Sequence, residues 1–181
     1  MFNVTDVSVV KEDAELAEER HQYVTFRLND EIYAIGALNV QEIIELSNIT
    51  KVPHLPAFLK GVINLRGTII PVVDLKLKFE MDSDGYGKHT CVVVTEFSGG
   101  VLGLIVDAVS DVMYISEEKI SAPPSFGAQI RTEFIKGMGR VGDDLVIILD
   151  VDRVLSEADT ISLKEAKKAL MSDEEGGNND G

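Results

Sequence analysis

FLKGVINLRGTIIPVVDL, residues 58–75, has a counterpart later in the chain in FIKGMGRVGDDLVIILDV, residues 134–151. The two stretches align without a gap at an offset of 76 residues, which is 134 minus 58, and in both an aspartate follows an apolar strand. A single match of four residues can arise by chance. A gapless match with the turn and the aspartate in the same places favours an internal duplication.

A second correspondence lies upstream of each stretch. Residues 28–32 lie over residues 97–101 at an offset of 69. The same offset brings Val40, Glu42 and Ile43 onto Val109, Asp111 and Val112. Each half then contains two short strands, a helical or bent segment, a connection with proline and two strands joined by a tight turn. This plan predicts a mostly β fold of two small β-barrel-like subdomains, with approximate sequence halves at 21–85 and 86–155.

The local patterns of the first half predict a hairpin followed by a short helix. Apolar and polar residues alternate over 24–28, and a polar turn leads into a second apolar strand over 32–35. Three apolar residues then follow at helical spacing: Val40, Ile43 and Ile44. Asn39 is available as a cap, so we expect a helix over residues 39–45.

The two ends of the chain differ in composition from the middle. Residues 1–20 are acidic and lack apolar periodicity, which predicts a flexible leader. Near the other end, Ser162-Leu163-Lys164-Glu165 has the form of a capping box and predicts a C-terminal helix within residues 156–172. Residues 173–181 are acidic, rich in glycine and without large apolar side chains, so a disordered tail is expected there.

The charge balance and the short apolar stretches narrow the classes of function. The formal net charge is −14, whereas nucleic acid and anionic membrane surfaces need clustered lysine and arginine, so proteins are favoured as partners. No apolar stretch approaches the ~20 residues that span a bilayer. No basic segment followed by an apolar one marks a secretory signal, and we therefore expect a cytoplasmic protein.

Several short stretches resemble motifs of enzymes and metal proteins, but the residues around them do not fit those functions. The G-x-G-x-x-G pattern at residues 137–142 precedes a strand rather than a phosphate-binding helix. Asp82-Ser83-Asp84-Gly85 begins like a calcium loop, but Val93 stands where the final glutamate is needed. The histidines are scattered, and Cys91 lies in an apolar run where a buried small side chain is expected. The sequence therefore predicts a protein that is not an enzyme, with no cofactor and no metal site.

The two copies differ most clearly in one turn. The second copy has Val141-Gly142-Asp143-Asp144, which is ordinary hairpin chemistry. The first has Asn64-Leu65-Arg66-Gly67-Thr68, and so places Arg66 where the other copy has Gly142. A solvated surface arginine is one interpretation. The other is an anchor for a protein partner, because one copy of a duplicated scaffold can take on a task of its own.

The stretch at residues 58–75 also closely resembles the hallmark of the CheW family of chemotaxis coupling proteins. The resemblance extends to Val40-Gln41-Glu42-Ile43 and to residues 103–112, and it covers residues 21–155 as a whole. It implies a pair of SH3-like β-barrels and leaves room for exchange of a strand between them. It further implies a non-catalytic adaptor that binds the cytoplasmic tip of chemoreceptors and the regulatory domain of the histidine kinase CheA, is recruited to membrane-associated receptor arrays and can form rings with CheA.

The resemblance also supplies a set of contact positions. The residues predicted to contact the receptor or the kinase are Val40, Glu42, Ile43, Asn64, Leu65, Arg66 and Gly67. A receptor tip is a helical hairpin, and a groove for it needs apolar walls and a few charges that set the register. Val40 and Ile43 are expected to form that wall. Arg66 is expected at its edge, where a planar guanidinium can bind carboxylates or helix-end carbonyls.

Two other interpretations stay open at this point. A CheW-like adaptor can serve a pathway other than flagellar swimming, such as pilus motility or development, and genomic neighbours would distinguish these. A small-ligand-binding or enzymatic barrel is the alternative from another class. It would need a cluster of polar residues in a pocket, for which the sequence gives no sign.

Overall fold

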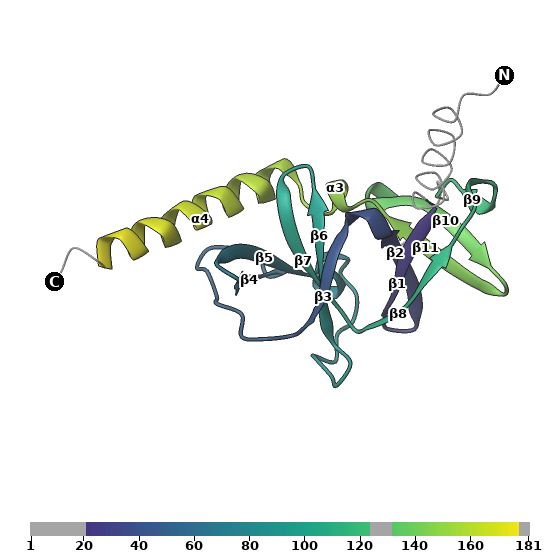
Figure 1. Ribbon diagram of the computed structural model, residues 1–181, viewed down its shortest axis with the longest axis horizontal. Helices are drawn as coiled ribbons and strands as arrows, with labels where there is room; N and C mark the ends of the chain where they lie inside the picture. Colours follow the sequence, from purple (N-terminus) through teal and green to yellow (C-terminus); the bar gives the residue numbers. More distant parts are fainter. Residues whose placement is uncertain (1–20, 124–131, 178–181) are drawn as a thin grey trace, which may run out of the picture.

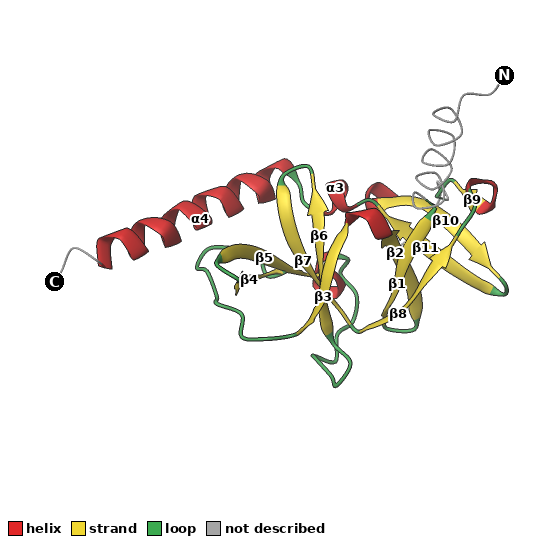
Figure 2. Cartoon of the chain, viewed as in Figure 1, coloured by secondary structure: helices red, strands yellow, loops and turns green. Residues whose placement is uncertain are grey.

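A computed structural model describes residues 21–123 and 132–177 of the chain, with the backbone alone over 171–177. The predicted leader at 1–20 and residues 178–181 of the predicted tail lie outside the described residues. The described part is mostly β, as the sequence predicts, and its strands form two sheets that lie side by side (Figure 1, Figure 2).

The six-stranded sheet is called barrel A and the five-stranded sheet barrel B. The strand order of barrel A is β8 (Ala108–Tyr114), β1 (Gln22–Leu28), β2 (Glu31–Gly36), β11 (Asp144–Leu149), β10 (Ile135–Val141) and β9 (Ile120–Ser121). The order of barrel B is β3 (Val40–Glu45), β6 (Cys91–Phe97), β7 (Gly100–Val106), β5 (Thr68–Asp74) and β4 (Leu59–Leu65). After β8 the chain returns to β10 through β9, and after β3 it returns to β4 through a bridge between Thr50 and Val62. Each sheet therefore curls into an SH3-like barrel.

Short helices connect the strands. They are η1 (Ala37–Asn39), α2 (Leu75–Lys78), η2 (Glu117–Lys119), η3 (Thr132–Phe134) and α3 (Val151–Val154). The aspartate that ends each repeated strand begins the next helix: a carboxylate oxygen of Asp74 accepts from the Leu77 amide at 3.2 Å, and one of Asp150 accepts from the Asp152 amide at 3.1 Å. Helix capping therefore explains why an aspartate stands in register in both copies.

The element boundaries confirm the duplication. At the offset of 76, β4 lies over β10 and α2 over α3. At the offset of 69, β1 lies over β6 and β3 over β8. Both barrels thus have the same ground plan, and a difference between equivalent positions is a difference between two copies of one unit.

The two barrels are not the two sequence halves. The hairpin β1–β2 pairs with strands of the second half, through an antiparallel contact with β8 and a parallel contact with β11. The hairpin β6–β7 in turn pairs with β3 and β5 of the first half. The copies have exchanged a hairpin each, so the structural units differ from the predicted halves at 21–85 and 86–155.

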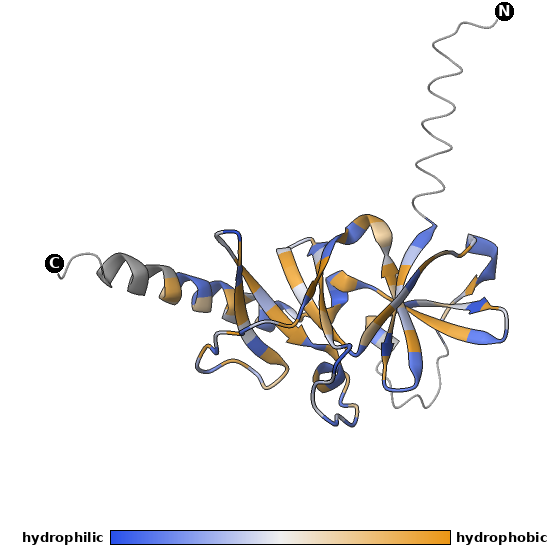
Figure 3. Ribbon diagram, turned by 60° about the horizontal axis from the view of Figure 1, so that its bottom comes forward, coloured by the Kyte–Doolittle hydropathy of each residue, from blue (hydrophilic) through white to orange (hydrophobic). Residues whose placement is uncertain are grey.

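Three apolar cores follow from this arrangement. One lies within barrel A and contains Ala34 and Ile148, and one lies within barrel B and contains Val92 and Val94. The largest draws on both barrels: Val24, Phe26, Leu28, Tyr33, Ile35, Leu59, Val73, Val93, Leu102, Leu104, Val106, Ile147 and Leu149 are among its members. Several strands are therefore buried on both faces, which is why their apolar runs are nearly continuous (Figure 3).

The helix predicted over residues 39–45 is wrong. Val40–Glu45 is strand β3, paired antiparallel with β6 from Cys91 to Thr95. The register shifts between Val40 and Glu42, which marks a β-bulge at Gln41. A bulge interrupts the two-residue alternation of a strand, so the apolar residues fall at spacings that resemble a helix. Pairing with a buried neighbouring strand decides the outcome.

The C-terminal helix α4 runs from Glu157 to Gly177. It begins near the predicted start but is capped by Ser156, which donates its amide to Asp159 at 3.0 Å while its hydroxyl accepts from the Asp159 amide at 3.1 Å. It also continues through residues 173–177, where a disordered tail was predicted. Leu163 and Ala166 are buried, and the later part of the helix leads away from the barrels (Figure 1).

A partly buried ion pair holds the start of α4 against the junction. The Lys78 ammonium lies 3.2 Å from Asp159 and sits over the ring of Phe58 at 4.1 Å. Burial would raise the pKa of Asp159, but hydrogen bonds from Ser156 and the Lys78 ammonium lower it below its ordinary value.

No helix within residues 21–123 and 132–177 is long and apolar enough to cross a membrane.

Candidate functional site

The tip of the β4–β5 hairpin presents Arg66. Leu65 pairs with Thr68, so Arg66 and Gly67 form a two-residue loop, with φ of 50° and 86°. Two positive φ angles are what a type I′ turn requires, and they are unusual for an arginine. The Asn64 carboxamide oxygen accepts from the Gly67 amide at 2.9 Å and braces the loop. The predicted residues Asn64 and Gly67 thus form the turn that presents the Arg66 side chain to solvent.

Arg66 is paired with another predicted residue, Glu42 of β3. One guanidinium nitrogen lies 2.5 Å from a Glu42 carboxylate oxygen, and the second lies 3.4 Å from the other oxygen. The Arg66 side chain is 74% exposed and that of Glu42 28% exposed. We call this interaction the Arg66–Glu42 clasp. It joins a hairpin tip to an edge strand and leaves most of the guanidinium open to solvent.

The bulge in β3 sets the direction of Glu42. Gln41, the bulged residue, donates from its carboxamide to Glu96 at 2.7 Å. The buried Thr95 hydroxyl donates to the Asn39 carbonyl at 2.9 Å, just before the strand. Both bonds tie the start of β3 to β6. They hold Glu42 in the place where it meets Arg66.

The two residues predicted to form one apolar wall differ in their exposure to solvent. Val40 packs against the core shared by both barrels, whereas Ile43 is 44% exposed and outside that core. Leu65 is half-buried against the core of barrel B. Val40 pairs with Thr95 and Ile43 with Val93, two residues apart on β6, so both lie on the same face of the sheet, and the common wall of Val40 and Ile43 stays a prediction. Ile43 is the most exposed of these three side chains and offers apolar surface to a partner.

A second exposed apolar surface was not predicted from the sequence. On β8 of barrel A, Val112 is 55% exposed and Tyr114 is 57% exposed. Val112 is the counterpart of Ile43 at the offset of 69, so the repeat comparison contains a signal for it. The signal is weak, because a valine in a strand is usually buried. The exposed position becomes evident only once β8 is seen at the edge of its sheet.

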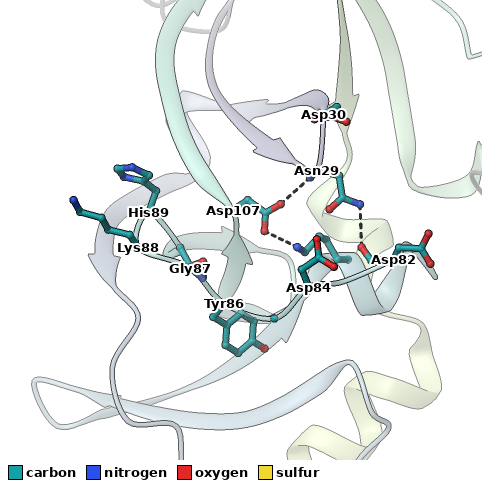
Figure 4. Close-up of a pocket in the computed structure, with 12 residues that line it drawn as sticks. Asn29, Asp30, Asp82, Asp84, Tyr86, Gly87, Lys88, His89 and Asp107 are labelled. Atoms are coloured by element: carbon teal, nitrogen blue, oxygen red, sulfur yellow. Dashed lines mark hydrogen bonds and ion pairs between the residues drawn. The ribbon is translucent and has the colours of Figure 1, made fainter.

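A polar cavity of about 600 Å³ lies at the junction on the side of the β1–β2 turn (Figure 4). Lys76, whose side chain is 7% exposed, pairs with Asp107 at 2.8 Å, and the other Asp107 oxygen accepts from the Asn29 amide at 2.7 Å. Asp107 stands where the chain passes from β7 to β8, so this pair ties the two barrels together. This cluster was not predicted from the sequence, because it forms from segments far apart in the chain.

Burial raises the pKa of two titratable side chains, Tyr86 and Cys91. Tyr86 donates to the buried Asp74 at 2.8 Å. The pKa of the Tyr86 hydroxyl is raised mainly by burial and in addition by this hydrogen bond. Burial likewise raises the pKa of the Cys91 thiol, which disfavours the reactive thiolate. Within residues 21–123 and 132–177 no group of three or more acidic, histidine or cysteine side chains is placed to hold a metal ion. The exposed, charged features of the site suit recognition of another protein.

Comparisons with known proteins agree on one family. A family model described as CheW-like domain matches residues 22–159. A chemotaxis protein CheW of Klebsiella aerogenes is 36% identical over 148 residues, which are 82% of this chain and 89% of that protein. A chemotaxis protein CheW of Treponema pallidum is 32% identical over 145 residues, 77% of this chain and 84% of that protein. The crystal structure of the scaffolding protein TtCheW from Thermoanaerobacter tengcongensis matches with a TM-score of 0.72 and 36% identity, over 77% of this chain and 90% of that chain.

Proposed function

The chain belongs to the CheW family of chemotaxis adaptor proteins, and from this premise we propose that it links the cytoplasmic tips of chemoreceptors to the regulatory domain of the histidine kinase CheA. It acts by binding and holding its partners in one complex, without catalysis. Its place of action is the receptor array at the membrane, and ring assembly with the kinase is part of the same proposal.

The observation that carries the proposal is the exposed Arg66–Glu42 clasp. An arginine held at positive φ stores unfavourable backbone energy of about 1–2 kcal/mol relative to an ordinary conformation. The turn itself does not need an arginine at this position, because a glycine with positive φ forms the equivalent turn of the other barrel. A binding role explains the choice, since a guanidinium fixed in one direction loses little freedom when a partner arrives.

The clasp also prepares Arg66 for a partner. Each terminal nitrogen of the Arg66 guanidinium donates one hydrogen bond to Glu42, which fixes the orientation of the group. The remaining N–H donors of the guanidinium stay available to a partner. A carboxylate or a helix-end carbonyl can accept from these donors, as the resemblance implies for a receptor tip. Ile43, the next residue of β3, points to the opposite face of this edge strand and supplies exposed apolar area there.

Rigidity of the whole molecule supports an adaptor role. The largest apolar core draws on both barrels, and the Lys76–Asp107 pair and the Lys78–Asp159 pair reinforce the junction. A partner bound to one barrel is thus held at a constant distance and angle from a partner bound to the other. Individual contacts of such an assembly can be weak, because many attachments act together.

The test measures binding of purified full-length protein to a receptor-tip fragment and, separately, to the isolated regulatory domain of CheA. Wild-type protein is expected to bind both. Arg66→Glu, which places two carboxylates side by side, is expected to weaken receptor binding at least tenfold. Circular dichroism checks that the variant folds.

Two further variants sharpen the result. Arg140→Glu is the matched control, because it reverses another exposed arginine on an equivalent hairpin of barrel A. The double variant Glu42→Arg with Arg66→Glu restores an ion pair within the chain but with the charges exchanged. If that double variant binds as wild type does, Arg66 serves the fold and not the partner. Wild-type protein that binds neither partner contradicts the proposed function.

A further inference from the structure

The duplication gives the junction between the barrels two equivalent contacts with different chemistry. Asn29 of the β1–β2 turn and Ser98 of the β6–β7 turn correspond at the offset of 69, and the backbone amide of each donates to an aspartate. On one side the Ser98 amide lies 2.6 Å from a carboxylate oxygen of Asp152 on α3. On the other side, the residue equivalent to Asp152 at the offset of 76 is Lys76, whose ammonium cannot accept a hydrogen bond.

Asp107 supplies the carboxylate that Lys76 cannot offer. One Asp107 oxygen accepts from the Asn29 amide at 2.7 Å (Figure 4), and the other lies 2.8 Å from the Lys76 ammonium. The Asp107 amide also donates to the Arg27 carbonyl at 3.0 Å, which ties this residue to β1. The equivalent of Asp107 at the offset of 69 is Leu38, an apolar residue that cannot form such a contact. We call the Lys76–Asp107 pair with its Asn29 hydrogen bond the junction bridge.

The junction bridge joins elements of different barrels. Lys76 lies on α2, directly after β5 of barrel B, whereas Asn29 lies in the turn of the β1–β2 hairpin of barrel A. A second hydrogen bond runs between the same two regions, from the Asn29 carboxamide to the carbonyl of Asp82 at 3.0 Å, in the segment after α2. The β1–β2 turn of barrel A is therefore tied at two points to the barrel B side of the junction.

The charges of the junction bridge are largely shielded from water. The Lys76 side chain is 7% exposed and that of Asp107 is 28% exposed. A buried ion pair adds little net stability, because removing two charges from water costs about as much as their attraction returns. Charge-assisted hydrogen bonds are directional, however, whereas apolar contacts have no preferred direction. The bridge is therefore suited to fix a geometry rather than to add stability.

We infer that Lys76 and Asp107 are positioning residues that fix the angle between the two barrels, and that control of the kinase by the receptor depends on this angle. An adaptor that holds a partner on each barrel passes on a change at one of them only if the barrels keep a fixed relation. Shear between the barrels would absorb such a change. The inference rests on the proposed function, but its effect on the angle is measurable on the protein alone.

The first measurement is the distance between the barrels in the purified full-length protein, by pulsed electron paramagnetic resonance. Spin labels are attached at Thr68→Cys and Asp144→Cys, equivalent exposed positions on two hairpins, and Cys91→Ala removes the native thiol. Lys76→Met keeps the length of the side chain without its charge and is expected to give a wider distribution of distances. Lys76→Arg retains the cation and is expected to restore the wild-type distribution.

The second measurement compares binding with kinase control. Affinities for the receptor-tip fragment and for the CheA regulatory domain are measured separately. Receptor control is the change in CheA autophosphorylation when the receptor fragment is added to kinase and adaptor. Lys76 and the Arg66–Glu42 clasp bind different residues, so in Lys76→Met each affinity should stay within about twofold of wild type. Receptor control should fall by about two- to thirtyfold, the range that substitutions between two coupled sites reach.

Lys78→Met is the matched control. Lys78 lies on the same helix, its side chain is 11% exposed and its ammonium lies 3.2 Å from a carboxylate, but that carboxylate belongs to Asp159 of α4. Its loss is expected to lower the free energy of unfolding without changing receptor control. The double variant Lys76→Met with Asp107→Asn leaves no unpaired charge and keeps a carbonyl oxygen for the Asn29 amide. It is expected to show the same loss of control, and it takes the place of Lys76→Met if that variant does not fold.

Three results would overturn the inference. A wild-type distribution of distances in Lys76→Met and in the double variant means that the apolar core alone sets the angle. A wider distribution with unchanged receptor control means that kinase control does not depend on the angle. An equal loss of control in Lys78→Met assigns the effect to stability and not to geometry. Failure of the proposed function looks different, because wild-type protein then binds neither partner while the distances still report on the junction bridge.

Discussion

Replacing Phe26 by alanine tests whether the two barrels are one folding unit. Phe26 is fully buried in the core that draws on both barrels, and it stacks on Tyr33 with ring centroids 6.2 Å apart. Truncation of a buried phenylalanine costs about 3–5 kcal/mol in the free energy of unfolding. Domains of this size are stable by about 5–15 kcal/mol, so the variant should stay folded but lose much of its margin.

The expected shift is large enough to measure by urea denaturation. With a denaturant slope of about 2 kcal/mol per molar, a loss of 4 kcal/mol lowers the midpoint by about 2 M. Far-UV circular dichroism is the readout, since the chain has no tryptophan. Val112→Ala is the control, because Val112 is exposed and its truncation should change the free energy of unfolding by less than about 0.5 kcal/mol.

Amide hydrogen exchange distinguishes a shared core from two separate ones. In Phe26→Ala the most protected amides of β1 in barrel A and of β7 in barrel B should lose protection by the same factor, since one core is opened. Loss of protection in barrel A alone, with barrel B unchanged, would refute the argument that the barrels fold as one body. It would also mean that the two barrels do not hold their partners at a constant distance and angle.

Two further predictions concern a glycine and a pH effect. Gly61→Ala should lower the free energy of unfolding by more than about 2 kcal/mol, because φ is 142° and a Cβ would clash with the Thr50 carbonyl at the bridge that closes barrel B. The control is Gly85→Ala, which has a positive φ but open space around it and should cost about 1 kcal/mol. Equal shifts in melting temperature for the two variants would contradict the steric explanation. The lowered pKa of Asp159 means that its pairing with Lys78 stabilises α4 fully above the unfolded value of 3.8 and is lost as pH falls through the folded value. Exchange protection of α4 amides should therefore fall in acid, and Asp159→Asn should remove that dependence; a variant with the same acid response would show that another group is responsible.

The duplication gives the molecule two equivalent edge strands that are used differently. In barrel B the acidic residue of the edge strand is paired with Arg66, whereas in barrel A its counterpart Asp111 forms no ion pair within the described residues and accepts from the Val112 amide at 2.8 Å. Equivalent scaffolds thus present a guanidinium on one side and a carboxylate on the other.

Much of this protein follows from the sequence alone. The repeated stretch at 58–75 and 134–151 predicted the β class, the paired hairpins and the equivalence of Arg66 with Gly142, because turns and strand-ending aspartates are encoded by a few adjacent residues. The family resemblance over 21–155 agrees with the matched family model. The prediction failed over Val40–Glu45, where a bulge disguised the period of a strand, and at α4, where Ser156 rather than Ser162 caps the helix.

The partners across the fold were decided only by the tertiary structure. The exchange of hairpins between the repeats pairs Thr25 with Asp111, which are 86 residues apart, and no local pattern records such a pairing. The sequence marked Glu42 and Arg66 separately as contact residues, and the curl of barrel B brought them together across 24 residues. Local side-chain periodicity determines which face of a strand is buried. Which strand lies beside it depends on how all the apolar faces can be covered at once, and that is a property of the whole chain.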